Sequence, residues 1–416
     1  MYPEQTVWPH PPKLGPLPSG RSAAAVILVA GSAFGTVTMC SGGSKSGAGA
    51  SEAGSDGGPA TTDGALEGAA DQAVTDSSDS SPSSACPMTG PTSGLDDPDA
   101  SLGLVPVSVV DENGSLRFAV WVSINGVEVQ AMLDTGAPGL RVLASAIAEA
   151  GVTALDSGPL QIDYNGGLVL SGYAASGNVG LQGLTTPIAD VPMQVVTSAC
   201  DLQFDAQAPD GSTPCNPATP SIFGMSATLG ISLRQYRTTG AVTLRSPLAS
   251  LAGYPPFIVH LNGTSATAGD DAGTLEIGVT AAERATFPYW SHLTGGPAPV
   301  WNDLSVQSCI RDETADGGCW TQGTFLDTGN DNPYIETLDA GAPTPGARWP
   351  STDTAAIALL GDNGCVIRQY QVPASTVAVR KLAPGTTTEN NVGYGVFYQV
   401  DVLFDPASGW IGMRPR

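Results

Sequence analysis

The sequence is poor in charged side chains, and above all in basic ones. Of its 416 residues only 13% are charged, and 16 Lys and Arg stand against 39 Asp and Glu, for a formal net charge of −23. A protein that binds nucleic acid needs a basic face to neutralise phosphates, so this composition argues against a nucleic-acid partner. An acidic balance fits an exported protein, but it does not identify a substrate.

Histidine is the second scarce residue. The chain has three, His10, His260 and His292, and no spacing of Cys or His resembles a zinc site. We therefore expect no metal and no cofactor, and we expect His260 and His292 to be packing or surface residues. The chain also lacks a Gly-x-Ser-x-Gly motif, which together with the few histidines argues against a serine hydrolase.

Glycine and proline are abundant instead, with 52 and 34 copies. Such a composition favours short strands and turns over long helices. Strand-like alternation dominates from residue 103, for example at Leu116, Phe118, Val120, Val122 and Ile124. Asn125-Gly126 follows this run and predicts a two-residue hairpin turn. The sequence therefore predicts an all-β fold.

The first 40 residues have the features of an export signal. Lys13 and Arg21 precede an apolar run that starts at Ala23, and Cys40 follows that run directly. A cysteine there, with a Gly/Ser-rich tail behind it, resembles a bacterial lipoprotein signal, although Met39 replaces the usual small residue. Lipidation of Cys40, plain secretion and a short membrane anchor all stay open. Each of them places the rest of the chain outside the cytoplasm, in the cell envelope or secreted.

Residues 41–102 contain Gly, Ser, Ala, Asp and Pro and almost no large apolar side chains. They cannot bury enough surface to offset the entropy of ordering, so we expect a disordered linker, which would act as a tether if Cys40 carries lipid. The folded part is therefore expected to begin near residue 103.

Seven cysteines are present, and four of them form two closely spaced pairs: Cys200 with Cys215, and Cys309 with Cys319. In an oxidising compartment we expect each pair to form a disulfide. If Cys40 carries lipid, Cys86 and Cys365 are left over. They can pair with each other, but the sequence does not decide it.

An apolar run that ends in Asp-Thr-Gly occurs twice, at 133–136 and 326–329. One such tripeptide is a common turn and carries little information. Two copies, each following a strand pattern in a β-rich half, are far more specific. The paired arrangement resembles the pepsin-like aspartic proteases, whose two lobes each carry one such motif. The segment 134–142 also resembles bacterial pepsin-like proteins of uncharacterised function, which have a Gly-Leu-Arg run after the first motif.

Further segments resemble the same family in the same order. Residues 161–184 are similar to its flap hairpin, with Tyr164 in the place of the flap tyrosine and Gly166 beside it. Residues 221–226 resemble the apolar-apolar-Gly element that crosses under the first catalytic loop. The remaining matches are the first strands of the second lobe, at 257–263 and 273–279, and the C-terminal stretch, at 393–416.

The resemblance implies two β lobes around a central cleft, at 103–245 and 246–416. It implies that Asp134 and Asp327 share one proton, because two like charges so close together cannot both ionise easily. One carboxyl then acts as base toward a water and the other as acid toward the peptide carbonyl. In the family, the motif glycines let the chain turn sharply, and the motif threonines bond across the lobes. Here the glycines are Gly136 and Gly329, and the threonines are Thr135 and Thr328.

The expected function is accordingly an aspartic-type endopeptidase that acts on a peptide or protein substrate, as a monomer. The alternative is a non-catalytic protein with the same fold, secreted or lipid-anchored, that binds peptides in the same cleft.

Four positions depart from the family pattern. Ala137 replaces a Ser or Thr whose hydroxyl usually bonds the first aspartate. Asn330 takes the same position after the second motif, and its amide could still reach the second aspartate. Arg141 replaces a Trp that bonds the flap tyrosine; close to the dyad it would lower the pKa of an aspartate, and it could also contact an acidic ligand. Asn391 stands where an apolar residue is expected in the second crossing element.

Overall fold

A computed structural model of the chain describes residues 101–112, 115–164, 168–201, 221–237, 242–263, 271–312, 320–337, 354–361, 364–381 and 389–416. The export segment with Cys40, nearly all of the linker, and Cys86, Gly166, Cys215 and Cys319 lie outside these residues, so the predictions made for them stay predictions. No helix in the described part of the chain is long and apolar enough to span a membrane.

Thirteen strands form the larger sheet. They are β1 (Gly103–Glu112), β2 (Ser115–Ile124), β3 (Val127–Asp134), β4 (Pro138–Leu143), β5 (Thr153–Asp163), β6 (Leu168–Leu181), β7 (Ile188–Asp201), β8 (Ala227–Ile231), β11 (Phe257–Leu261), β12 (Asp271–Ile277), β13 (Tyr289–His292), β21 (Val400–Asp405) and β22 (Trp410–Pro415). Their order across the sheet is β13-β22-β21-β11-β12-β1-β2-β3-β8-β4-β7-β6-β5.

Seven strands form the second sheet, in the order β18-β17-β14-β15-β20-β16-β19. They are β14 (Gln307–Asp312), β15 (Trp320–Phe325), β16 (Tyr334–Thr337), β17 (Thr354–Leu360), β18 (Val366–Pro373), β19 (Ala378–Lys381) and β20 (Glu389–Asn391). The other described elements are short: the paired strands β9 (Gln235–Arg237) and β10 (Thr243–Arg245), helix α1 (Ala281–Arg284), and the 3₁₀ turns η1 (Ala144–Ile147), η2 (Pro247–Ser250), η3 (Asp303–Ser305), η4 (Ala374–Thr376) and η5 (Tyr394–Tyr398).

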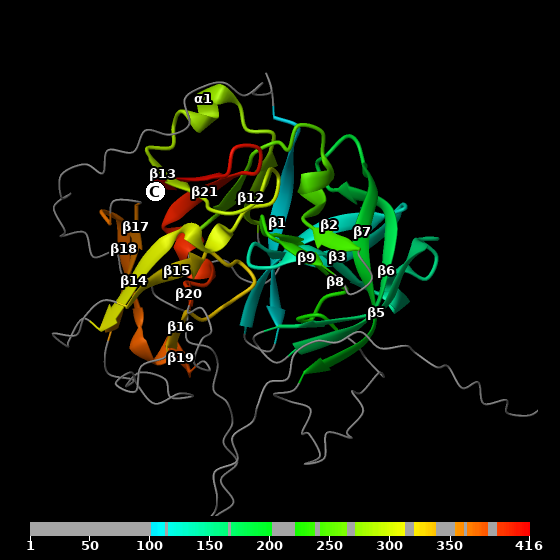
Figure 1. The fold of residues 1–416 in the computed structure, drawn as a ribbon, viewed down its shortest axis with the longest axis horizontal. Helices are drawn as coiled ribbons and strands as arrows, with labels where there is room; N and C mark the ends of the chain where they lie inside the picture. The colour runs from blue at the N-terminus through cyan, green and yellow to red at the C-terminus, as the bar shows by residue number, and fades with distance from the viewer. Residues whose placement is uncertain are drawn as a thin grey trace, which may run out of the picture. The chain divides into compact units, whose positions relative to one another are not determined.

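One pattern of five strands occurs twice, once in each sheet. In the succession β2-β3-β8-β4-β7 the pairings are antiparallel, parallel, antiparallel and parallel. The succession β14-β15-β20-β16-β19 has the same four pairings in the same order. Figure 1 shows the first set in cyan to green and the second in yellow to orange. The predicted all-β, two-lobed architecture is therefore confirmed.

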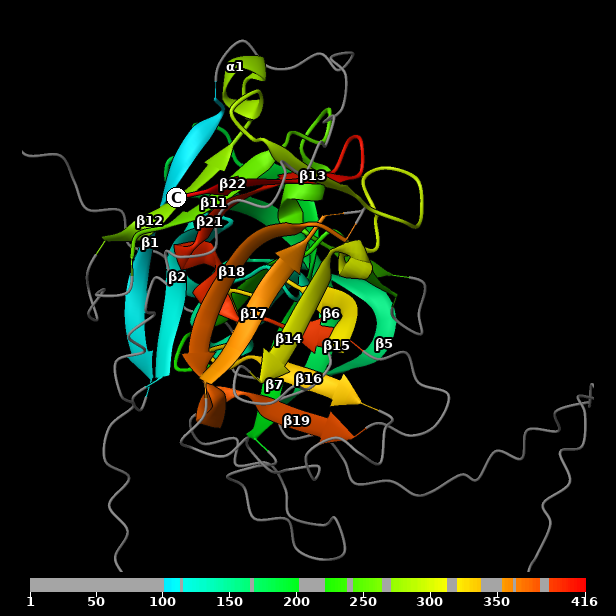
Figure 2. The same cartoon turned by 90° about the vertical axis from the view of Figure 1, so that its left-hand side faces the viewer.

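The remaining strands join the C-terminal part of the chain to the first set. β1 pairs with β12 on one side, from Gly103 opposite Ile277 onward, and with β2 on the other. β11, β21 and β22 continue the sheet beyond β12. These strands lie side by side in Figure 2, so the two ends of the folded part share one sheet.

The predicted hairpin turn is present between β2 and β3. Ile124 pairs with Val127, and both turn residues have positive φ, 48° at Asn125 and 89° at Gly126. Asn and Gly tolerate this left-handed backbone, and such turns match the twist of the two strands. The turn fixes the register of β3, whose last residue is Asp134.

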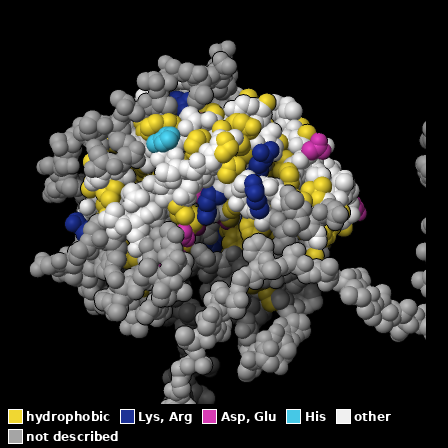
Figure 3. Space-filling view, in the orientation of Figure 1, with side chains coloured by type: hydrophobic (Ala, Val, Ile, Leu, Met, Phe, Trp, Pro, Cys, Tyr) yellow, Lys and Arg dark blue, Asp and Glu magenta, His cyan; other side chains and the backbone are white. Residues whose placement is uncertain are grey.

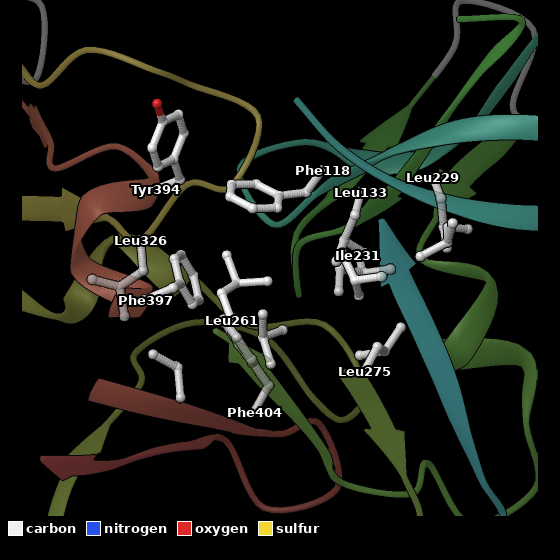
Figure 4. Close-up of a cluster of buried hydrophobic side chains, with 14 of the residues drawn as sticks. Phe118, Leu133, Leu229, Ile231, Leu261, Leu275, Leu326, Tyr394, Phe397 and Phe404 are labelled. Carbon is white, nitrogen blue, oxygen red and sulfur yellow. The ribbon is translucent and has the colours of Figure 1, made fainter. Parts of the chain in front are cut away.

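A continuous apolar cluster anchors the residues that precede both aspartates. Leu133 is fully buried and Leu326 is 4% exposed, and both belong to one cluster that also contains Phe397 and Phe404. Figure 4 shows these side chains together with Leu229 and Ile231 of β8. Burial of one such leucine contributes about 1.5–3 kcal/mol, so each Asp-Thr-Gly loop begins at a firmly held point.

Candidate active site

The two aspartates lie on loops that face each other. Asp134 ends β3 and is 3% exposed, whereas Asp327 follows β15 and is partly exposed. A Cβ added to Gly136 would lie 2.6 Å from both carboxylate oxygens of Asp327, and one added to Gly329 would lie 2.9 Å from an oxygen of Asp134. Each glycine thus leaves room for the aspartate of the other loop.

This close approach gives the two glycines a role beyond the expected sharp turn. Neither Gly136 nor Gly329 is among the residues with positive φ, so no left-handed turn requires them. Glycine is needed at both positions because any side chain would collide with the opposite carboxylate.

The two motif threonines hold the loops together with a reciprocal set of hydrogen bonds. The Thr135 amide donates to Thr328 Oγ1 at 3.0 Å, and the Thr328 amide donates to Thr135 Oγ1 at 2.9 Å. Each hydroxyl donates in turn to a backbone carbonyl of the opposite strand end, Thr135 to Leu326 at 2.6 Å and Thr328 to Leu133 at 2.7 Å. All four atoms are buried, so the contact is a dry, fully paired joint between the lobes.

A strand crosses beneath each loop. β8 runs parallel to β3 and pairs Gly230 with Asp134, and β20 runs parallel to β15 and pairs Asn391 with Phe325. The first crossing element is therefore Ala227–Ile231, and its prediction at 221–226 is wrong. Residues 222–225 form a tight turn instead, closed by hydrogen bonds between Ile222 and Met225, with positive φ at Phe223 and Gly224.

Asp134 is poised to hold a proton near neutral pH. Burial, followed by the negative charge of Asp327, raises its pKa from 3.8 to about 7. The Arg141 guanidinium and the amides of Gly136 and Ala137 pull that pKa down; both amides donate to Asp134 Oδ1 at 2.9 Å. Arg141 thus has the predicted direction of effect, but burial and Asp327 outweigh it.

Arg141 links the first loop to Tyr164, which follows β5 in the predicted flap hairpin. Its side chain is only 2% exposed and donates to the carbonyls of Gly139 and Pro138. Its guanidinium carbon lies 5.2 Å from the centroid of the Tyr164 ring. Tyr164 also packs edge-on against Phe223, at 5.4 Å. A cation–π contact thus stands where the family pattern has a Trp beside the flap tyrosine.

Asp327 receives donors on both oxygens. The Gly329 amide donates to Oδ1 at 2.8 Å, and the Asn391 side chain donates to Oδ2 at 2.7 Å. Burial raises the pKa of Asp327, and these donors lower it. Asn330, whose amide was expected to reach this carboxylate, donates to the Asn332 carbonyl instead. Asn391 fills that role from the crossing strand, which its place in the sequence alone did not reveal.

Two further arginines contact the loops, and sequence reasoning missed both. Arg117, on β2, donates to the Gly329 carbonyl at 3.2 Å, and Arg234, just after β8, donates to the Gly136 carbonyl. Their positive charges lower the pKa of Asp327. Arg234 is held by an ion pair with Asp303 at 2.8 Å. Neither arginine belongs to a motif, and only the fold brings them to the site.

The surface of the molecule is hollowed on one face. Figure 3 shows a recess near the middle of one face, with Lys or Arg side chains gathered beside it. No group of three or more His, Cys, Asp or Glu among the described residues is placed to hold a metal ion. His260 lies on β11 and contacts Asp401 at 2.8 Å, and His292 is exposed beside Trp410.

Three described cysteines, Cys200, Cys309 and Cys365, stand in disulfides. Since Cys215, Cys319 and Cys86 lie outside the described residues, the predicted pairings of Cys200 and Cys309 stay predictions.

No family model matches the chain, and no curated protein matches it. Among solved structures, it is similar to an aspartic proteinase from Irpex lacteus, with a TM-score of 0.48 and 13% sequence identity over 75% of this chain and 97% of that chain.

Proposed function

We propose that the chain is an aspartic-type endopeptidase, in which Asp134 and Asp327 activate a water for hydrolysis of a peptide bond. One observation carries this proposal: the carboxylates of two structurally repeated loops face each other so closely that each stands where a side chain on the opposite loop would be.

The electrostatics of the pair support acid–base chemistry. Because the pKa of Asp134 is raised to about 7, the pair retains one proton over much of the acidic and neutral range. A pair with one proton contains a base that can take a proton from water and an acid that can give one to a carbonyl oxygen. Facing carboxylates cost stability, and perturbed pKa values of this kind gather at functional sites.

The β5–β6 hairpin, with Tyr164, would provide the cover for a bound substrate. Tyr164 is held between Arg141 and Phe223, beside the first loop, and its buried hydroxyl interacts with Thr228. A hairpin that closes over an extended peptide excludes water from the reacting bond. Activity is expected to fall above about pH 7, as the shared proton is lost.

The test is cleavage of a denatured protein by the full chain, followed by mass spectrometry of the products from pH 3 to pH 8. We expect internal cuts that disappear when a statine-type transition-state mimic is present. As controls, Asp134→Asn and Asp327→Asn should cut nothing. If the wild type binds peptides without cutting them, the alternative of a non-catalytic peptide-binding protein replaces this proposal.

A further inference from the structure

The hydrogen-bond donors around the two carboxyl groups are unevenly distributed. On Asp327, Oδ1 accepts from the Gly329 amide and Oδ2 accepts from Asn391. On Asp134, both donors, the amides of Gly136 and Ala137, fall on Oδ1. No donor among the described residues reaches Asp134 Oδ2. It is therefore the one carboxyl oxygen of the four that accepts no hydrogen bond from the described residues, which favours it as the place of the proton.

The orientation of the Asn391 amide is fixed by a second bond. The Gly393 amide donates to Asn391 Oδ1 at 2.8 Å, so Oδ1 must face Gly393 and Nδ2 must face Asp327. An amide nitrogen donates only, so the Asp327 oxygen that it meets must accept. Asn391 is 3% exposed, which keeps water from competing for this bond.

The equivalent position of the other lobe makes no such bond. Thr228 precedes Gly230 in β8 as Asn391 precedes Gly393, and each lies opposite the residue two places before an aspartate. The Thr228 hydroxyl interacts with the Tyr164 hydroxyl and makes no bond to Asp134. The repeated backbone thus carries a donor toward Asp327 and none toward Asp134.

The charges around the pair also favour the ionised form of Asp327 over that of Asp134. Arg117 and Arg234 both act on Asp327, in addition to the Asn391 and Gly329 donors. On the other side, Arg141 is the one cation among the main influences on Asp134, where it works against burial and the charge of Asp327.

We propose that Asn391 is a positioning residue that keeps Asp327 as the base of the pair and leaves the shared proton on Asp134. This assignment deepens the proposed endopeptidase function and rests on it. Asp327 then takes a proton from the water as the water oxygen bonds to the carbonyl carbon, and Asp134 gives its proton to the carbonyl oxygen. When the carbon–nitrogen bond breaks, Asp327 gives its proton to the leaving nitrogen. Asp134 recovers a proton from the hydroxyl, and the starting state returns.

The direct test is a titration of the two carboxyl carbons by NMR in the full chain labelled with ¹³C-aspartate. Asp134→Asn and Asp327→Asn variants assign the signals. In the wild type we expect Asp327 to ionise first and Asp134 to ionise near neutral pH. In Asn391→Leu the Asp327 step should move up by about one pKa unit, because a charge-assisted hydrogen bond to its ionised form is lost. Asn330→Ala is the matched control, since this nearby amide bonds Asn332 and alanine brings no new donor to the carboxylate, so it should leave both steps in place.

Asn391→Asp guards against a leucine variant that does not fold, because it keeps the shape and the Gly393 bond. It should also raise the Asp327 step, through repulsion and the lost donor. In the pH–rate profile of peptide cleavage, each variant should move the acidic limb upward by as much as it moves the Asp327 titration step. A merely structural role would lower the rate without moving that limb. If Asp134 ionises first in the wild type, or if the folded Asn391 variants leave the Asp327 step unmoved, the assignment is overturned. If the titration behaves as expected but no peptide is cut, the proposed function fails, and only the placement of the shared proton on Asp134 stands.

Discussion

The two Asp-Thr-Gly loops share a backbone and differ in their surroundings. In both, the strand before the aspartate is anchored in one core, the amide two residues on donates to the carboxylate, and a strand crosses beneath. Around Asp134 stand a buried arginine and a tyrosine ring, whereas around Asp327 stand an asparagine amide and two partly exposed arginines. The repeated backbone brings two like groups together, and the different side chains make them chemically unlike.

The first prediction concerns what the two aspartates have in common. Asp134→Asn and Asp327→Asn should each reduce peptide cleavage by roughly 10²–10⁴-fold or more, because either change removes half of the acid–base pair. Asp271→Asn is the control: among the described residues this exposed aspartate on β12 bonds the Gly273 amide alone, and the change should leave the rate unaltered. Substantial cleavage by either of the first two variants would show that the pair is not the catalyst.

The second prediction separates the two aspartates by stability. The folded-state pKa of Asp134 lies at about 7, above its ordinary 3.8, so the unfolded chain ionises first as the pH rises. Stability is therefore lost between about pH 4 and pH 7 and is not regained above that range. Asp134→Asn removes this loss, and we expect it to raise the free energy of unfolding at pH 7 by about 2–4 kcal/mol, with no gain at pH 3.

Asp327→Asn should raise the free energy of unfolding at pH 7 by less than Asp134→Asn does. Asn suits position 134, where both donors fall on one oxygen, but at 327 its amide nitrogen would face either Gly329 or Asn391. Urea unfolding of both variants at pH 3 and pH 7 measures the difference. Equal gains in the two variants would contradict the unequal surroundings.

The third prediction tests the symmetric joint between the lobes. Thr135→Val and Thr328→Val keep the shape and leave a buried amide of the opposite loop unpaired, so each should lower the free energy of unfolding by about 2–4 kcal/mol. The two losses should be alike, since the bonds are reciprocal. Thr376→Val, at an exposed hydroxyl that bonds Pro373, is the control and should cost well under about 1 kcal/mol. Clearly unequal losses would show that one loop holds the joint alone.

These comparisons also show what the sequence could predict. The paired motifs, the Asn125-Gly126 turn and the alternation in β2 follow from local chemistry, so the fold class and both aspartates could be found. The first crossing element was missed because Ile222-Phe223-Gly224 matches the apolar-apolar-Gly pattern, whereas β8 has Thr228 before Leu229 and Gly230.

The donors around Asp327 depend on tertiary structure. Asn391 could be noted as an exception to the pattern, but only the pairing of β20 with β15 shows that its amide meets the carboxylate. Arg117 and Arg234 are far from the second motif in sequence, and nothing in their neighbours signals the contact.

The smallest predicted effect concerns Arg141. Arg141→Leu removes a positive charge that lowers the pKa of Asp134, so that pKa should rise, and the alkaline limb of the pH–rate profile should move up by about one unit. Arg141→Lys keeps the charge and loses the planar stacking on Tyr164, so it should shift the limb less. A downward shift in Arg141→Leu would contradict the sign of this interaction.

The most direct measurement is the rate of peptide cleavage by the wild-type chain from pH 3 to pH 9. Two facing carboxyl groups that share one proton predict a bell-shaped profile whose alkaline limb falls near pH 7, the pKa of Asp134. A rate that does not change through pH 7, or the absence of cleavage at every pH, would contradict the account.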